Sequence, residues 1–282
     1  LGSLAQAEPE SPDSIVRVGA CATPGITWGV FVQDSFAYVA DRDRLTVVDI
    51  VVPSAPSVAG TLTQTGVVWP VALFVRDTLA YLHNHGIFSI VSVSDPSSLY
   101  VLGWCFTSSG VGLEPKDICV KENTGYLTEG SEGFNIINAV DPSLPELVDS
   151  CQTPGTAVDL FVKDTLAYIA DYDSLQIFSV ADSTNAYRVG AVAMPNSCYD
   201  VSVVDTFAYV VCQSSFGTDG TLQVVNVSDP NNPYIVDSVT MNGDPLAVYV
   251  LGNYAYVAAA DYWASRRGGK RQVGGLALEW TL

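Results

Sequence analysis

The sequence is poor in positive charge and in charged residues generally. Only 12 Lys and Arg stand against 30 Asp and Glu among 282 residues, which gives a formal net charge of −18. A surface of that charge repels phosphate, so no nucleic-acid or anionic-lipid partner is expected. Charged residues make up 15% of the chain and hydrophobic ones 48%. This composition excludes a disordered acidic tail and is sufficient for a large core.

Several functional signals are also missing from the sequence. There is no run of about 20 apolar residues, so no membrane-spanning helix is expected. There is no Cys-x-x-Cys pair, and His83 and His85, the two histidines, have no third metal ligand that the sequence can name. Neither a nucleophile elbow nor a phosphate-binding glycine loop occurs. The sequence therefore contains no catalytic motif.

The six cysteines leave two interpretations open. An even number is compatible with disulfides in an oxidising compartment, and the spacing does not decide how they would pair. Alternatively, they are small buried residues on strands, as cysteines often are. Cys21 and Cys151 occur in similar segments, Cys-Ala-Thr-Pro-Gly and Cys-Gln-Thr-Pro-Gly, which favours packing for these two.

Residues 1–14 form an N-terminal extension that is separate from the rest of the chain in composition. Ala5-Gln6-Ala7 has the small-x-small pattern of a signal-peptidase site, and an acidic, proline-containing stretch follows it. The extension is either the end of a signal sequence or a flexible terminus.

Internal repetition predicts the fold. A turn followed by an aromatic strand recurs six times, with its tyrosines 41 to 47 residues apart: Tyr38, Tyr81, Tyr126, Tyr168, Tyr209 and Tyr256. In the fourth repeat the β-rich segments are 157–162, 166–170, 175–180 and 187–192, each bounded by turn residues. Four short antiparallel strands in a repeat of 40 to 50 residues are typical of a propeller blade.

The predicted domain, residues 15–282, is therefore an all-β, six-bladed β-propeller of four-stranded antiparallel blades. The last repeat provides three strands, at 246–251, 254–259 and 276–281. Residues 15–25 match the end of a repeat, so the N-terminal strand at 15–21 is expected to complete the last blade and close the ring. Closure would remove the exposed sheet edges.

The unit Ala-Tyr-Ile-Ala-Asp at 167–171, with Leu-Gln-Ile-Phe-Ser-Val at 175–180, resembles the LVIVD repeat of bacterial and archaeal secreted or cell-surface propellers. The resemblance covers nearly all of residues 15–282. It implies a β-propeller located outside the cell or on its surface. It supplies no catalytic residues, and a fold alone does not define a function.

Two groups of residues are candidate binding sites. Asp117, Asp159 and Asp200 take the same place in the third to fifth repeats and could hold Ca²⁺ at the centre of the ring. Alternatively, each accepts hydrogen bonds from amides, since the other three repeats have no carboxylate there. Aromatic residues expected near the mouth could bind a glycan or peptide: Trp28, Trp69, Tyr172, Tyr199 and Trp263. The carboxylates beside them are also ordinary turn residues. No other cofactor is expected.

The cations are concentrated in one segment, with Arg266, Arg267, Lys270 and Arg271 on a predicted hairpin tip. A basic hairpin on an acidic body favours contact with other copies of the chain. The first functional hypothesis is therefore a non-catalytic extracellular protein that assembles into an oligomer or filament through this hairpin and the N-terminal residues Leu1, Leu4, Ile15 and Val16. A glycan- or peptide-binding module is the alternative, and a hydrolase is a third possibility.

Overall fold

The computed structural model describes residues 17–23, 25–41, 44–63, 72–84, 86–107, 117–213, 220–241, 243–260 and 273–279. Every regular element in these ranges is a β-strand, which confirms the all-β class. The first and second sheets contain β1 (Thr27–Gln33), β2 (Phe36–Asp41), β3 (Arg44–Asp49), β4 (Ser57–Thr63), β5 (Ala72–Arg76), β6 (Leu79–Asn84), β7 (Ile87–Ser92) and β8 (Tyr100–Phe106). The third and fourth sheets contain β9 (Ile118–Lys121), β10 (Thr124–Thr128), β11 (Phe134–Asn138), β12 (Glu146–Cys151), β13 (Ala157–Lys163), β14 (Leu166–Asp171), β15 (Ser174–Ser179) and β16 (Tyr187–Ala193). The fifth and sixth sheets contain β17 (Ser197–Val204), β18 (Phe207–Gln213), β19 (Gly220–Asn226), β20 (Tyr234–Met241), β21 (Asp244–Leu251), β22 (Tyr254–Ala260) and β23 (Val273–Glu279).

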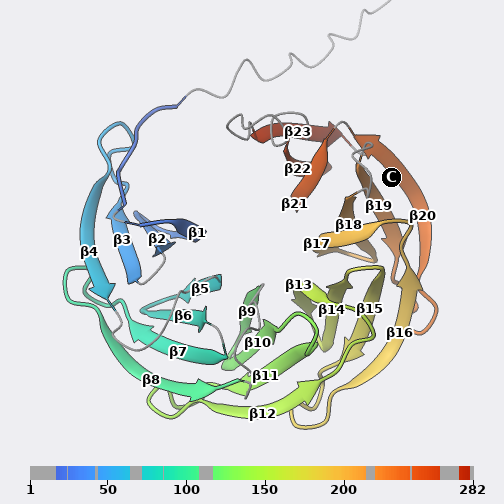
Figure 1. Cartoon of the computed structure of the whole chain (residues 1–282), viewed down its shortest axis with the longest axis horizontal. Helices are drawn as coiled ribbons and strands as arrows, with labels where there is room; N and C mark the ends of the chain where they lie inside the picture. The colour runs from blue at the N-terminus through green and yellow to red at the C-terminus, as the bar shows by residue number, and fades with distance from the viewer. Residues whose placement is uncertain are drawn as a thin grey trace, which may run out of the picture.

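The sheets are antiparallel and follow one another around a ring, with the first strand of each sheet nearest the centre (Figure 1). This is a β-propeller-like arrangement. The four strands expected in the fourth repeat are present as β13–β16, each within one residue of its predicted ends. Within the described residues no helix is long and apolar enough to cross a bilayer.

The turn between the first and second strands explains the repeated acidic residue before each aromatic strand. Its first residue has a left-handed backbone, with φ between 51° and 57°, in all six sheets: Asp34, Asp77, Glu122, Asp164, Asp205 and Gly252. Asp and Gly enter this region at lower cost than bulkier residues. The tight hairpin therefore selects the residue type, and Glu122 is the one departure.

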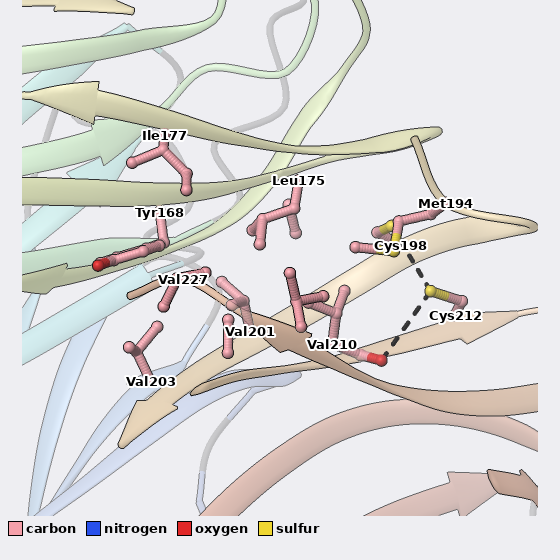
Figure 2. Close-up of a cluster of buried hydrophobic side chains, with 13 residues drawn as sticks. Tyr168, Leu175, Ile177, Met194, Cys198, Val201, Val203, Val210, Cys212 and Val227 are labelled. Carbon is pink, nitrogen blue, oxygen red and sulfur yellow. Dashed lines mark hydrogen bonds between the residues drawn. The ribbon is translucent and has the colours of Figure 1, made fainter. Parts of the chain in front are cut away.

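Apolar side chains form a core cluster in each contact between consecutive sheets, from the first and second to the fifth and sixth. Figure 2 shows the cluster between the fourth and fifth sheets, where Tyr168, Leu175 and Ile177 face Val201, Val203 and Val210. The repeating aromatic and β-branched positions are thus the inter-sheet core. Burial of this kind stabilises the fold by about 25 cal/mol per Å² of apolar surface.

The sixth sheet has three strands, and β23 begins three residues before the predicted third strand. Residues 17–23 are not assigned to a strand, so the predicted pairing of residues 15–21 with this sheet is not formed among the described residues. The count of six complete blades and the closure of the ring remain predictions. Figure 1 shows the gap between the sixth and first sheets.

Candidate functional site

Carboxylates at the ends of the second strands bind the segment that leads into their own sheet. Asp171, at the end of β14, accepts hydrogen bonds from Thr153 Oγ1 at 2.7 Å and from the Gly155 amide at 2.9 Å. Asp41, at the end of β2, accepts the corresponding bond from the Gly25 amide at 3.0 Å. These bonds explain why Thr-Pro-Gly occurs twice. They favour the turn-structure interpretation of the acidic residues over ligand binding.

Glu129 follows β10 at the same position but reaches the neighbouring sheet. Its Oε1 lies 3.0 Å from Nε2 of His83 on β6, and both side chains are fully buried. Asn135 Nδ2 lies 3.3 Å from the same oxygen and also donates to the Thr107 carbonyl at 2.8 Å. Burial raises the pKa of Glu129, but the hydrogen bond and charge of His83, with bonds from Thr107 and Asn135, lower it overall. The pair therefore joins the second and third sheets and is closed to a substrate.

Asp117, Asp159 and Asp200, the candidate Ca²⁺ ligands, are close enough to interact with one another. Asp159 and Asp200 directly follow a β-bulge in their strands, and a bulge re-aims the side chain after it. Asp159 accepts a bond from the Val201 amide of the next sheet at 2.8 Å, and Asp200 accepts one from the Val248 amide at 2.8 Å. Asp117 interacts in the same way with the Leu160 amide. Each carboxylate thus connects its own sheet to the next.

The negative charges of these three carboxylates repel one another. Burial raises the pKa of all three, and for Asp159 the neighbouring charges of Asp200 and Asp117 raise it further, well above its ordinary value. In the described part of the chain, no group of three or more His, Cys, Asp or Glu side chains is arranged to hold a metal ion. The geometry therefore favours hydrogen bonding between sheets, one of the two interpretations left open by the sequence, over a Ca²⁺ site.

Two of the five predicted aromatic ligand-binding residues meet. The rings of Tyr172, in the turn after β14, and Tyr199, on β17, have centroids 6.4 Å apart. Tyr172 is 46% exposed and has a left-handed backbone with φ 55°. Trp28 is exposed on β1, but no described contact joins it to this pair. Trp69 and Trp263 lie outside the described residues, as do the predicted assembly residues: Leu1, Leu4, Ile15, Val16, Arg266, Arg267, Lys270 and Arg271.

The first sheet has an exposed apolar face toward the gap in the ring. Val30 is 63% exposed. The residues at the same register position in the other five sheets are 3–9% exposed: Leu73, Ile118, Leu160, Val201 and Val248. Val32 is likewise 57% exposed. These valines therefore lie on a core surface without a neighbouring sheet.

The sixth sheet has the matching exposed face. Tyr256 is 45% exposed, whereas the five other repeat tyrosines are buried. Tyr249, its cross-strand partner on β21, and Tyr254 are exposed as well. We call the two faces together the seam.

Residues 17–23 lie against the first sheet at the outer side of the seam. Four of them, Gly19, Ala20, Cys21 and Thr23, line a groove of about 420 Å³ together with Val39, Val48 and Pro53. A Cβ added to Gly19 would lie 2.0 Å from the Pro53 carbonyl oxygen. Gly60 and Gly190, on outer strands β4 and β16, approach Pro96 and Pro230 of the next sheet in the same way. Gly19 is therefore placed as an outer-strand glycine of a sheet preceding the first.

One outer strand differs from the others in composition. The strand β8 has the sequence Tyr-Val-Leu-Gly-Trp-Cys-Phe, with three aromatic residues and no charged one, whereas β4 is also uncharged but has no aromatic residue. Trp104 and Phe106 are 53% and 63% exposed, and their rings contact each other edge to face with centroids 5.2 Å apart. At the register position of Trp104, β16 has Ala191 and β20 has Ser238. An uncharged aromatic edge strand is a surface suited to pairing with another strand.

Sequence comparison identifies the repeat. A family model of the LVIVD repeat matches residues 24–64, 114–153, 197–241 and 242–262, more than half of the chain. The chain belongs to the LVIVD-repeat family. The predicted resemblance is therefore confirmed, and no curated protein shows detectable sequence similarity to this LVIVD-repeat protein.

Solved structures confirm the propeller-like arrangement. A functionally unknown protein from Desulfotomaculum acetoxidans superposes with a TM-score of 0.69 at 12% identity, covering 93% of this chain and 92% of that one. A protein from Lactobacillus plantarum gives 0.68 at 15% identity, covering 88% and 82%. A putative 6-phosphogluconolactonase from Bacteroides fragilis gives 0.66 at 11% identity, covering 87% and 82%. At these identities the likeness extends to the fold alone.

Two features of this LVIVD-repeat protein were missed by the sequence analysis. The His83–Glu129 pair connects residues 46 positions apart, and alignment with Asp171, which binds the entry to its own sheet, gives no sign that Glu129 reaches the neighbouring sheet. The strand β8 was treated as an ordinary fourth strand. Its three aromatic residues could have distinguished it from β4, which is also uncharged but has no aromatic residue, and from β12, β16 and β20, each of which contains a charged residue.

Proposed function

We propose that this LVIVD-repeat protein is a non-catalytic assembly protein of the cell exterior, and that two copies associate by pairing their β8 strands. The observation behind the proposal is the exposed Trp104–Phe106 pair on an uncharged outer strand. The outer edge of such a strand has free amides and carbonyls that another strand can pair with. Because two antiparallel copies of one strand are self-complementary, a second copy is the occupant that this edge fits.

Electrostatic attraction cannot hold two copies of this chain together at β8. The body has a net charge of −18, so two copies repel each other at long range. An uncharged patch with two large aromatic rings provides the attraction at short range, and aromatic pairs add about 0.5–1.5 kcal/mol beyond their burial. A two-fold dimer contact closes on itself and cannot propagate into a filament. A filament would therefore need further contacts between dimers, and residues 1–16 and the basic segment 266–271 would provide them.

The same proposal includes six complete blades in a closed ring. The sixth sheet docks on Val30 and Val32 of its own first sheet, and residues 15–21 become its fourth strand. The position of Gly19 against Pro53 supports this, as does the identity of Arg17-Val18-Gly19-Ala20 with residues 188–191 on β16.

A non-catalytic function is supported by the use of the buried ionisable groups. Asp41, Asp171, Asp159 and Asp200 accept amide hydrogen bonds, and Glu129 binds His83. The groups that could do acid–base chemistry thus already have structural partners.

Sedimentation velocity of the full chain over a range of micromolar concentrations tests the assembly. The wild-type chain is expected to dimerise, and Trp104→Asp is expected to be monomeric with an unchanged circular dichroism spectrum. Ala191→Asp is the matched control, because it places the same charge at the same register position of β16 and should leave the dimer intact. A monomeric wild-type chain, or a dimeric Trp104→Asp variant, would overturn the proposal.

Ionic strength separates this contact from attraction by the basic hairpin. Dimerisation through β8 should strengthen with added salt, because salt screens the repulsion between acidic bodies. A contact between segment 266–271 and an acidic surface would weaken instead. Association that is lost in 0.5 M salt would therefore argue against β8.

A second candidate function is the binding of a glycan or peptide at Tyr172 and Tyr199. The two rings come from adjacent sheets, and Tyr172 is held in a left-handed turn in which the Asp173 amide donates to the Asp171 carbonyl at 2.7 Å. Exposed paired rings are a suitable surface for sugar faces. Glycan-array binding that is lost in Tyr172→Ala but kept in Tyr187→Ala, an exposed tyrosine on β16, would support it.

A further inference from the structure

Two cysteines of the fifth sheet face each other. Cys198 on β17 and Cys212 on β18 are cross-strand partners, and their Sγ atoms are 3.6 Å apart (Figure 2). Both are fully buried, next to Met194. All six cysteines lie in the described residues, and among them this is the pair whose thiols contact each other.

The backbone at this position suits a covalent bond. The Cys198 amide donates to the Tyr172 carbonyl of the fourth sheet, so it does not bond to Cys212. Cross-strand residues that do not exchange amide hydrogen bonds have Cα atoms about 4.5 Å apart. Disulfides span Cα separations of about 4.4–6.8 Å. A small side-chain rotation therefore brings the two sulfur atoms within bonding distance.

The Cys198–Cys212 pair also occupies the place where other sheets have a hydrogen bond between a carboxylate and the entry of the first strand. Cys212 corresponds to Asp171 and Asp41, which bind the entry to the first strand of their sheets, and Cys198 corresponds to Ala157 on β13. A thiol cannot accept such hydrogen bonds with the strength of a carboxylate. A covalent link between β17 and β18 would fasten the same two segments.

We propose that Cys198 and Cys212 form an intrachain disulfide in the mature protein. Its formation requires a disulfide oxidant, either a small-molecule disulfide or a thiol–disulfide oxidoreductase. One cysteine thiolate attacks the oxidant and releases one thiol, and the second thiolate then attacks the mixed disulfide and releases the other. The two cysteines lose two protons and two electrons, and the oxidant is reduced to two thiols.

The reaction belongs to folding in an oxidising compartment. In the folded protein the hydrogen bond with Cys212, together with burial, raises the pKa of Cys198 above its ordinary value. A buried thiol with a raised pKa is a poor nucleophile. The bond is therefore expected to form before the fifth sheet packs on the fourth. Burial similarly raises the pKa of Cys105 and Cys119 to about 11 and of Cys151 to about 12.

Thiol counting on the wild-type full chain tests the proposal without any variant. The chain is exported to a bacterial periplasm, unfolded in the presence of iodoacetamide and weighed by mass spectrometry. Four alkylated cysteines are expected, and six after reduction. Chymotrypsin can cut after Tyr199, Phe207 or Tyr209, so the two cysteines should appear in separate peptides that are linked before reduction. Six alkylated cysteines, or a linkage through any other cysteine, would overturn the proposal.

Stability gives a second readout. A reductant should lower the Tm of the wild-type chain by roughly 6–12 °C, as the loss of a short disulfide-closed loop predicts for a domain of this size. The Cys198→Ala/Cys212→Ala variant should already have the lower Tm and should not respond to reductant. Cys105→Ala is the control, and it should keep the full response. A wild-type Tm that does not change with reductant would contradict the bond. Neither result depends on association through β8.

Discussion

The contact between the fourth and fifth sheets and the seam between the sixth and first sheets are built from equivalent residues, yet one is buried and the other is open. Tyr168 is 4% exposed in the closed contact, and Tyr256 at the same repeat position is 45% exposed at the seam. Val201 and Val30 differ in the same way, at 3% and 63%. An apolar residue in a repeat is therefore part of the core only where the neighbouring sheet is in contact with it.

Side-chain hydrogen bonds between sheets also distinguish the closed contacts from the seam. Lys163, at the end of β13, donates to the Asp205 carbonyl of the next sheet at 2.7 Å, and Gln33 bonds to both the carbonyl and the amide of Asp77. The corresponding residue of the sixth sheet is Leu251, which has no polar side-chain atom. Within the described residues the seam therefore offers apolar surface at this position instead of a side-chain hydrogen bond, and we expect it to be the weakest junction between sheets.

The largest expected difference is between Tyr168→Ala and Tyr256→Ala. Removing a buried aromatic side chain from the closed contact should lower the free energy of unfolding by about 3–5 kcal/mol. At the seam, the sixth sheet can open without unfolding the other five, so the loss should be below about 1 kcal/mol. Urea denaturation of both variants measures the two values. Equal losses would mean that the seam is as tightly closed in solution as the other contacts.

Glu129→Gln tests a closed contact that contains a buried hydrogen bond between a carboxylate and a histidine. Leaving His83 buried without a carboxylate should cost roughly 2–4 kcal/mol at pH 7. Because the folded-state pKa of Glu129 is lowered, its contribution is present above the unfolded-state value and is lost as the pH falls through the folded-state value. The gap between wild type and variant, measured by urea denaturation, should therefore narrow on acidification.

Glu132→Gln is the control for this experiment, because Glu132 is exposed in the same loop. It should change stability little at either pH. A gap for Glu129→Gln that stays constant from pH 7 to pH 3 would show that the carboxylate charge is not what stabilises the contact.

Glycine-to-alanine substitutions at equivalent outer-strand positions, Gly190 and Gly19, compare the stability of the closed contact with that of the seam. A Cβ on Gly190 would lie 2.2 Å from the Pro230 carbonyl oxygen, so Gly190→Ala forces β16 away from the turn of the next sheet and should cost about 1–3 kcal/mol. Gly19→Ala should change global stability by less than about 0.5 kcal/mol but weaken the docking of the sixth sheet. Hydrogen exchange measured by mass spectrometry should then be faster in residues 244–260 alone. Unchanged exchange there would contradict the role of residues 15–21 as the closing strand.

The sequence predicted the repeat well because each strand carries its own local signals. The left-handed turn residues such as Asp164 and Asp205 and the alternation around Tyr168 both act within one hairpin. The family membership follows from the same local pattern. Contacts within a hairpin are therefore readable from the chain.

Contacts between sheets were predicted less completely. The register of the repeats placed Asp117, Asp159 and Asp200 together, but it could not indicate that each would accept an amide hydrogen bond from the next sheet, because that depends on the bulges. Glu129 occupies the position of Asp171, yet it bonds to His83 of the neighbouring sheet and not to the entry of its own sheet. Such details arise from the packing of one sheet on another, which periodicity does not encode.

The smallest expected effect is an increase in stability at the centre of the ring. Burial and the charges of Asp200 and Asp117 raise the folded-state pKa of Asp159, so the folded protein holds a proton there more tightly than the unfolded chain. Stability from this group is fully present below the unfolded-state pKa and is lost as the pH rises toward the folded-state value. Asp159→Asn removes that charge and keeps an oxygen that can accept the Val201 amide hydrogen bond.

Asp159→Asn should therefore raise the free energy of unfolding at pH 7 by about 1 kcal/mol, with a smaller gain near pH 4. Urea denaturation at the two pH values measures the difference. The first, second and sixth sheets have Gly29, Ala72 and Ala247 at this position, so half of the ring already lacks the charge. A loss of stability at pH 7 would contradict this expectation and would mean that the charged carboxylate itself stabilises the fold. A Tm that rises with Ca²⁺ in the wild-type chain but not in the variant would mean that the carboxylate binds a cation, because a purely structural acceptor would not respond to the metal.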